Sequence, residues 1–199
     1  SSFAGNFTFV IIFIVFLIFE ENHLKKKLNS VLSSSNIKIL NKIKYDIFFY
    51  FQLKTITSFL TGIFTFIILF FLENDLAPTF GIFSFFLNFI PFIGSLLSVL
   101  LPFIFSAVQF LNFFEPSLTF FLLLLIQVYI GNFLEPKLMG KTLNISPLVM
   151  IIFLTIMGKI WGVAGMFLSV PLLVIILIIL RNMKSTKKIA IILSESGEL

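Results

Sequence analysis

The uncharged stretch from Thr79 to Phe110, TFGIFSFFLNFIPFIGSLLSVLLPFIFSAVQF, decides what kind of fold this chain can adopt. One straight helix over these residues would be about 48 Å long, well beyond a hydrocarbon core of about 30 Å. The segment IPFIG at 90–94 indicates where the helix bends, because Pro91 lacks an N–H and Gly94 permits turns that other residues resist. We therefore expect a broken helix or re-entrant hairpin over residues 79–110.

The rest of the chain is similarly apolar. Of its 199 residues, 59% are hydrophobic and 12% are charged, whereas a soluble domain usually carries about 25% charged residues. This composition excludes a soluble globular domain and a disordered chain, and the absence of cysteine excludes a disulfide scaffold. The fold class that we predict is an all-α polytopic membrane protein with broken-helix hairpins and a polar helical linker.

Alternating apolar and polar segments predict the organisation. A second overlong apolar stretch, 147–180, contains GKIWGVAG at 158–165, where the glycines favour a break. The linker contains SSSN at 33–36, which reads as a turn with Asn36 capping the following helix. We expect a transmembrane helix at 1–19, a polar helix–turn–helix linker at 20–54, a membrane core at 55–180 with a span at 117–134 and a polar loop at 135–146, and a basic tail at 181–199.

Charge gives the expected orientation. The basic excess lies in 20–54 and 181–199, while 55–180 carries slightly more acidic than basic residues. Clusters of Lys and Arg mark the cytoplasmic side of a membrane, so we expect an inner-membrane protein with both segments cytoplasmic. If the two overlong segments, 79–110 and 147–180, are hairpins, the loop that carries Lys137 and Lys141 lies on the cytoplasmic side with the basic segments. Single tilted crossings would place this loop outside, against the bias. Neither basic segment interleaves Arg and aromatic residues, so we expect no nucleic-acid partner.

Signatures of catalysis are missing. The sequence has no Walker-type or dinucleotide-binding glycine motif, and its one histidine, His23, lies in the linker. Neither a histidine-based triad nor a histidine-pair metal site can be assembled. We expect no enzyme activity, no cofactor and no metal.

Polar residues and helix breaks at membrane depth are the remaining candidates for function, because polar groups there are costly unless used or paired. Gly/Pro-interrupted apolar segments point to substrate sites in transporters. Other readings stay open: interhelical hydrogen bonding by Asn88 or Gln127, a Glu135–Lys137 surface pair, and GxxxG packing. The candidate substrate-binding residues are Asn88, Pro91, Gly94, Gln127, Asn132, Glu135, Gly158, Gly162 and Gly165, and the candidate ion-coupling residues are Glu135 and Lys159.

Several blocks in order resemble the AI-2E (autoinducer-2 exporter) family. They are GIFSFFLNFIPFIGS at 81–95, GNFLEPKLMG at 131–140, LNISPL at 143–148 and WGVAGMFLSVPL at 161–172, with Tyr50 to Thr55 resembling the entry to a family span. Lys159 departs from the family pattern, which has an apolar or small residue there. The family's greater usual length implies further spans ahead of this chain.

The resemblance implies a bacterial inner-membrane transporter that exports a small polar signal such as autoinducer-2. From the polar residues and the helix breaks we expect alternating exposure of a polar site. An alternative is a Na⁺(Li⁺)/proton antiporter in which Glu135 titrates. A membrane scaffold or partner-binding subunit without transport is the competing class. The expected partners are the lipid bilayer and a small polar solute or a monovalent cation and protons, and a homo-oligomer is compatible with the small residues available.

Overall fold

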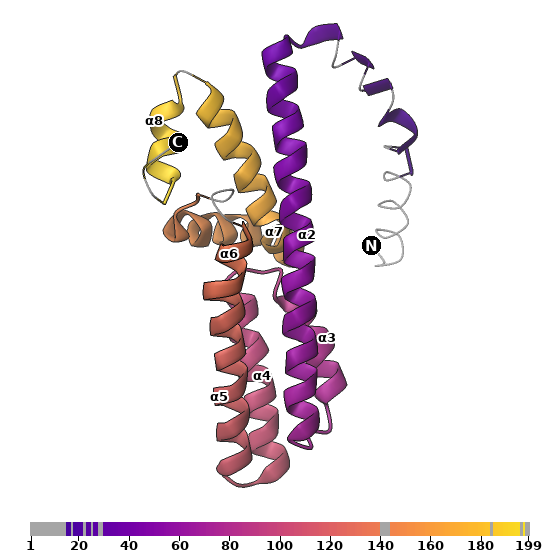
Figure 1. Ribbon diagram of the computed structural model, residues 1–199, viewed down its shortest axis with the longest axis vertical. Coiled ribbons are helices and arrows are strands. Elements are labelled where there is room, and N and C mark those ends of the chain that lie inside the picture. Colours follow the sequence, from indigo (N-terminus) through magenta and orange to yellow (C-terminus); the bar gives the residue numbers. More distant parts are fainter. Residues whose placement is uncertain are drawn as a thin grey trace. The chain divides into compact units, whose positions relative to one another are not determined.

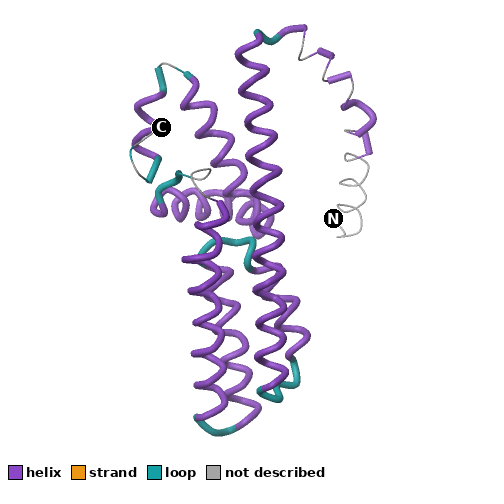
Figure 2. The backbone as a smooth tube through the Cα atoms, in the orientation of Figure 1, coloured by secondary structure: helices purple, strands orange, loops and turns teal. Residues whose placement is uncertain are grey.

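The computed structural model describes residues 15–16, 18–21, 23–24, 26–27, 30–139, 144–183, 185–195 and 197, and every regular element among them is helical (Figures 1 and 2). Four of these helices are long and apolar enough to cross a membrane, which confirms the all-α membrane fold class. The predicted span at 1–19 falls almost wholly outside the described residues. The elements are α2 (Ser34–Phe71), α3 (Ala77–Leu87), α4 (Ile93–Phe110), α5 (Phe114–Val128), the π-helix η1 (Tyr129–Leu134), α6 (Glu135–Met139), α7 (Pro147–Asn182) and α8 (Lys187–Leu193).

The chain divides into two compact units between Lys42 and Ile43. In the first unit the helical backbone is interrupted at residues 32–33, so the turn lies slightly ahead of the predicted 33–36, of which residues 34–36 are already helical. The expected cap was wrong, because Asn36 lies inside α2 and its backbone N–H points to the Ser33 hydroxyl at 3.5 Å. Ser33 is thus the residue placed to cap the helix, as serine commonly does.

Helix α2 continues without a break through residue 54, where we predicted the boundary between linker and membrane core. In the part of α2 that follows residue 54, the two faces of the helix differ sharply in polarity. The inward face repeats small hydroxyl residues four positions apart, Thr57, Thr61 and Thr65, all at most 2% exposed. The outward face presents exposed aromatic residues such as Phe59 and Phe70. A helix that buries hydroxyls and exposes phenylalanines suits a surrounding of lipid rather than water.

The first overlong segment forms the expected hairpin, α3–α4, broken at residues 88–92 (Figure 2, the loop between these helices). Phe92 has φ 60°, and a Cβ on Gly94 would lie 1.7 Å from the Leu87 carbonyl oxygen. Only glycine lets α4 start this close to the end of α3. At the far end, Asn74 donates to the Ser106 hydroxyl at 2.9 Å, so both arms return to the same level.

Helix α4 packs against α5, which runs antiparallel beside it (Figure 1). The apolar contact among these helices is a small core drawn from α2, the start of α3, α4 and α5: Leu69, Ala77, Phe80, Val99 and Leu123. Helix α5 then continues through η1 into α6. The polar loop expected from residue 135 is therefore wrong at its start, where 135–139 are helical.

The second overlong segment, α7, breaks at Gly162, inside the predicted 158–165 interval. A Cβ on Gly165 would lie 2.0 Å from the Met157 carbonyl oxygen, while one on Gly158 would meet Met166 Cε at 2.7 Å. Arg181 near the end of α7 donates to the Asn144 carbonyl just before its start at 3.2 Å. The segment therefore turns back on itself, and glycines close this hairpin as Gly94 closes the first.

Replacing Gly162 with alanine should lower stability through backbone strain alone. Gly162 has φ 63° and ψ −142°, a conformation that costs a residue with a Cβ about 1–3 kcal/mol. An added Cβ would meet no atom within 4 Å, so no steric clash contributes. Thermal unfolding in detergent should show a lower midpoint for Gly162→Ala than for Gly131→Ala, whose added Cβ also meets nothing within 4 Å and whose φ is not positive. Equal midpoints would contradict the strained turn.

Candidate functional site

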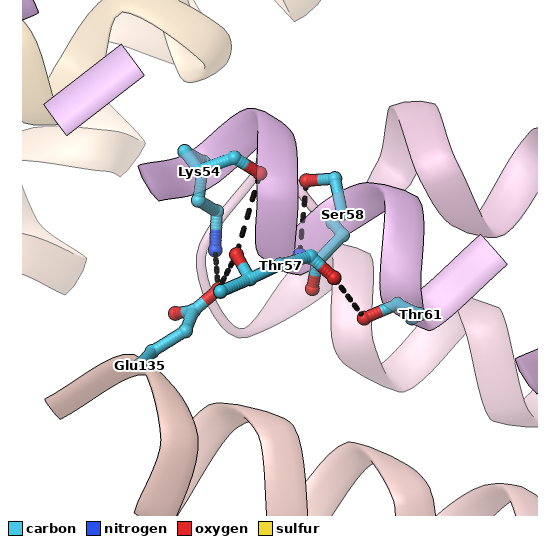
Figure 3. Close-up of polar contacts among 6 residues, drawn as sticks. Lys54, Thr57, Ser58, Thr61 and Glu135 are labelled. Atoms are coloured by element: carbon cyan, nitrogen blue, oxygen red, sulfur yellow. Dashed lines mark hydrogen bonds and ion pairs between the residues drawn. The ribbon is translucent and has the colours of Figure 1, made fainter. Parts of the chain in front are cut away.

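A buried ion pair joins α2 to the first residue of α6. Lys54 Nζ lies 2.6 Å from Glu135 Oε1, and the two side chains are 8% and 16% exposed. Figure 3 shows the amine and the carboxylate pointing toward each other from the two helices. Removing two charges from water is expensive, and their attraction offsets that cost only when the geometry is good and other hydrogen bonds assist. In a membrane protein such a pair is a functional-site candidate.

Neutral polar groups surround the same carboxylate oxygen. The Thr57 hydroxyl donates to Glu135 Oε1 at 2.8 Å (Figure 3). The same hydroxyl oxygen lies 3.3 Å from the Lys54 backbone carbonyl oxygen. Asn88 Nδ2 donates to the Ser58 hydroxyl at 3.0 Å and lies 3.5 Å from Glu135 Oε1. One carboxylate oxygen thus faces an ammonium, a hydroxyl and an amide. We call Lys54, Thr57, Ser58, Asn88 and Glu135 the polar cluster.

Helical spacing places the α2 members of the cluster together. Residues 54, 57 and 58 stand at i, i+3 and i+4, which puts their side chains on one face of the helix. Asn88 is the C-cap of α3, so the hairpin break itself delivers its amide to the cluster. The break therefore contributes to the site directly, because α3 ends where the Asn88 amide can contact Ser58 of α2 and Glu135 of α6.

Glu135 reaches the cluster from the end of a π-helix. The η1 turn, Tyr129–Leu134, comes immediately before it, and π-turns inside helices are frequently found at functional sites. The following Pro136 lacks the N–H that an α-helix would use for a bond to an earlier carbonyl. The wider turn changes the angular position of the residues after it, and Glu135 is the first of them.

The structure brings together two of the predicted site residues, Asn88 and Glu135. Pro91 and Gly94 shape the break beside them, and Gly158, Gly162 and Gly165 shape the break in α7. The structure does not bring in the others: Gln127 is buried farther back on α5, while Asn132 and Lys159 are exposed.

Sequence reasoning missed Lys54, Thr57 and Ser58. Lys54 was assigned to the linker because charged residues normally end a span, and hydroxyl residues carry little signal on their own. The spacing of a lysine with Thr and Ser three and four residues later was the available indication. The alternative reading of Glu135 and Lys137 as a surface pair does not hold, because Glu135 pairs with Lys54 and Lys137 is exposed.

The two hairpin breaks meet through aromatic rings. Phe89, in the α3–α4 break, stacks on Phe167 of α7 with ring centroids 4.8 Å apart. Phe167 also lies 6.3 Å from Phe51 of α2, measured between centroids. A movement of the α7 hairpin would therefore displace Phe89, the residue next to Asn88.

Comparison with known proteins gives a consistent picture. A family model described as AI-2E family transporter matches residues 1–185. A "Putative transport protein" of Borreliella burgdorferi is 36% identical over 203 residues, covering 98% of this chain and 55% of that protein. The "AI-2 transport protein TqsA" of Escherichia coli K12 is 39% identical over 146 residues, covering 73% of this chain and 42% of that protein. This chain spans about half the length of these curated relatives.

Proposed function

Because the chain belongs to the AI-2E family of transporters, we propose that it carries a small polar solute across the membrane and that the polar cluster binds this solute. The observation that carries the proposal is the buried Lys54–Glu135 pair, with hydroxyl and amide groups around it. Apolar helices do not keep such groups in their interior without a use for them.

The solute that we propose is neutral and rich in hydroxyl groups, such as autoinducer-2. TqsA of Escherichia coli, by its name, transports AI-2, and the family resemblance implies export. Thr57, Ser58 and Asn88 offer neutral donors and acceptors of the kind that hydroxyl groups require. Glu135 already faces the Lys54 ammonium, so a monovalent cation would have to displace that ammonium. This pairing favours a neutral solute over the antiporter alternative.

Alternating exposure of the cluster is the mechanism that we propose. Asn88 sits at the α3–α4 break, and Phe89 beside it stacks on Phe167 after the α7 break. A shift of either hairpin would move Asn88 relative to Ser58 and Glu135 and so open or close the site. We place the protein in the inner membrane, with the basic tail 181–199 and the part of the basic segment 20–54 that precedes the polar cluster in the cytoplasm, following the positive-inside bias.

Export through proteoliposomes tests the proposal. Thr57→Val and Asn88→Leu, made in the full-length protein, each remove polar groups that contact Glu135 while keeping the side-chain volume similar. Loss of a hydrogen bond to a charged group costs about 1.5–3 kcal/mol, so we expect efflux of labelled autoinducer-2 to fall by about tenfold or more.

The matched control is Thr55→Val, since Thr55 is exposed on α2 and its hydroxyl bonds only the Phe51 carbonyl at 2.7 Å among the described residues. Its efflux should stay within about twofold of wild type. Unchanged efflux in both cluster variants would remove the cluster from the site. A wild-type protein that moves neither the signal nor cations would instead favour a scaffold without transport.

A further inference from the structure

Helices α4 and α5 carry matching polar residues in antiparallel register. Ser106 of α4 and Thr119 of α5 place their hydroxyl oxygens 3.3 Å apart. Two turns back along α4 comes Ser98, and two turns forward along α5 comes Gln127. Because the helices are antiparallel and two turns of each have equal length, Ser98 and Gln127 stand at the same level.

The Ser98–Gln127 level differs from its neighbours in hydrogen bonding. Both residues are buried, at 2% and 8% exposed. Within the described part of the chain, Ser98 Oγ and Gln127 Nε2 are buried without any hydrogen-bond partner. Buried polar groups are nearly always satisfied, and those that are not call for an explanation. Two such atoms at the same level of the α4–α5 pair indicate a binding site for a molecule that forms hydrogen bonds.

This level lies between two satisfied polar groups of the helical unit. Gln127 precedes Glu135 of the polar cluster by eight residues and follows Thr119 by eight, a rise of about 12 Å in each direction. Thr119 belongs to a hydrogen-bonded set with Ser106 and Asn74. A solute that leaves the polar cluster along α5 would therefore meet the Ser98–Gln127 level next.

We infer that Ser98 and Gln127 form a second subsite for the neutral, hydroxyl-bearing solute, two helical turns from the polar cluster. The inference rests on the proposed transport function. The serine hydroxyl can donate and accept, and the glutamine amide donates, so together they can satisfy one solute hydroxyl. Water offers the same chemistry, and the experiment has to separate the two guests.

Cysteine accessibility makes this separation, because these 199 residues contain no cysteine. In a cysteine-free version of the full-length protein, Ser98→Cys is treated with a small methanethiosulfonate reagent, with and without excess autoinducer-2. The cysteine thiolate attacks the sulfur of such a reagent, forming a disulfide and displacing methanesulfinate, and the thiolate forms readily only in a wet, polar surrounding. The control is Val99→Cys, since Val99 is 4% exposed and lies in the apolar core.

The expected result is labelling of Ser98→Cys about tenfold faster or more than Val99→Cys, slowed several-fold by autoinducer-2. Fast labelling that the solute does not slow would mean water only and would overturn the subsite. Labelling as slow as that of Val99→Cys would mean sealed packing and would overturn it too. Efflux measured on the same wild-type preparation keeps the questions apart, because absent efflux refutes the proposed function, whereas normal efflux without protection refutes the subsite alone.

Gln127→Leu gives a second readout that a structural role would not produce. Its Nε2 makes no hydrogen bond within the described residues, so the substitution should leave the unfolding midpoint unchanged or raise it. The affinity for autoinducer-2 should nevertheless fall by about tenfold. A lower midpoint with unchanged affinity would show that Gln127 holds helices together instead.

Discussion

The Gly94→Ala variant is expected to lose the α3–α4 hairpin and with it the transport site. A Cβ at this position would lie 1.7 Å from the Leu87 carbonyl oxygen and 2.6 Å from its carbonyl carbon. Both are backbone atoms, so no side-chain rotation can relieve the overlap. The chain has to move α3 and α4 apart, and we expect a loss of more than about 4 kcal/mol in the free energy of unfolding.

The same displacement should abolish efflux, because Leu87 is bonded directly to Asn88. Any shift large enough to accommodate the methyl group lengthens the 3.0 Å contact between Asn88 and Ser58. Thermal unfolding in detergent and efflux of labelled autoinducer-2 from proteoliposomes measure the two losses. Gly131→Ala is the matched control, since its added Cβ meets no atom within 4 Å. A Gly94→Ala protein that melts and transports like this control would disprove the closed hairpin.

The two helix breaks were predictable because they follow from local chemistry. A proline and a glycine within four residues of an overlong apolar stretch leave few alternatives. The structure places the first break at 88–92, which overlaps the predicted 90–94 but begins two residues earlier, and the second at Gly162, inside the predicted 158–165. It adds how they close, through Gly94 against Leu87 and Gly165 against Met157, which depends on contacts that form only once the chain has turned.

The polar cluster was only half predictable, for two physical reasons. Glu135 and Asn88 stood out as polar residues among apolar ones, but the partner of Glu135 is Lys54, which lies 81 residues earlier. No local pattern reports such a pairing, and the charge on Lys54 made residue 54 look like the end of a linker. Asn132, also a candidate, lies outside the polar cluster because it is within η1 and exposed, and a π-turn is not visible in sequence spacing.

The second large effect is expected from Lys54→Met, which leaves the Glu135 carboxylate buried without its counter-ion. Breaking a buried pair by removing one partner costs about 3–5 kcal/mol, whereas replacing both partners with neutral groups is often tolerated. The double variant Lys54→Met/Glu135→Gln should therefore recover most of the stability that the single variant loses. Unfolding midpoints of the wild type and the single and double variants measure the coupling between the two residues.

Transport separates the structural role of this pair from its proposed functional one. If the pair belongs to the solute site, the stable double variant should still show efflux lowered by about tenfold or more, since the charged donor and acceptor are gone. Lys137→Met is the control, because Lys137 is an exposed lysine only two residues from Glu135, and it should change neither stability nor efflux. A double variant as unstable as the single would deny the pairing. One that exports like wild type would reduce the pair to a clamp between α2 and α6, leaving the hydroxyl and amide groups to bind the solute.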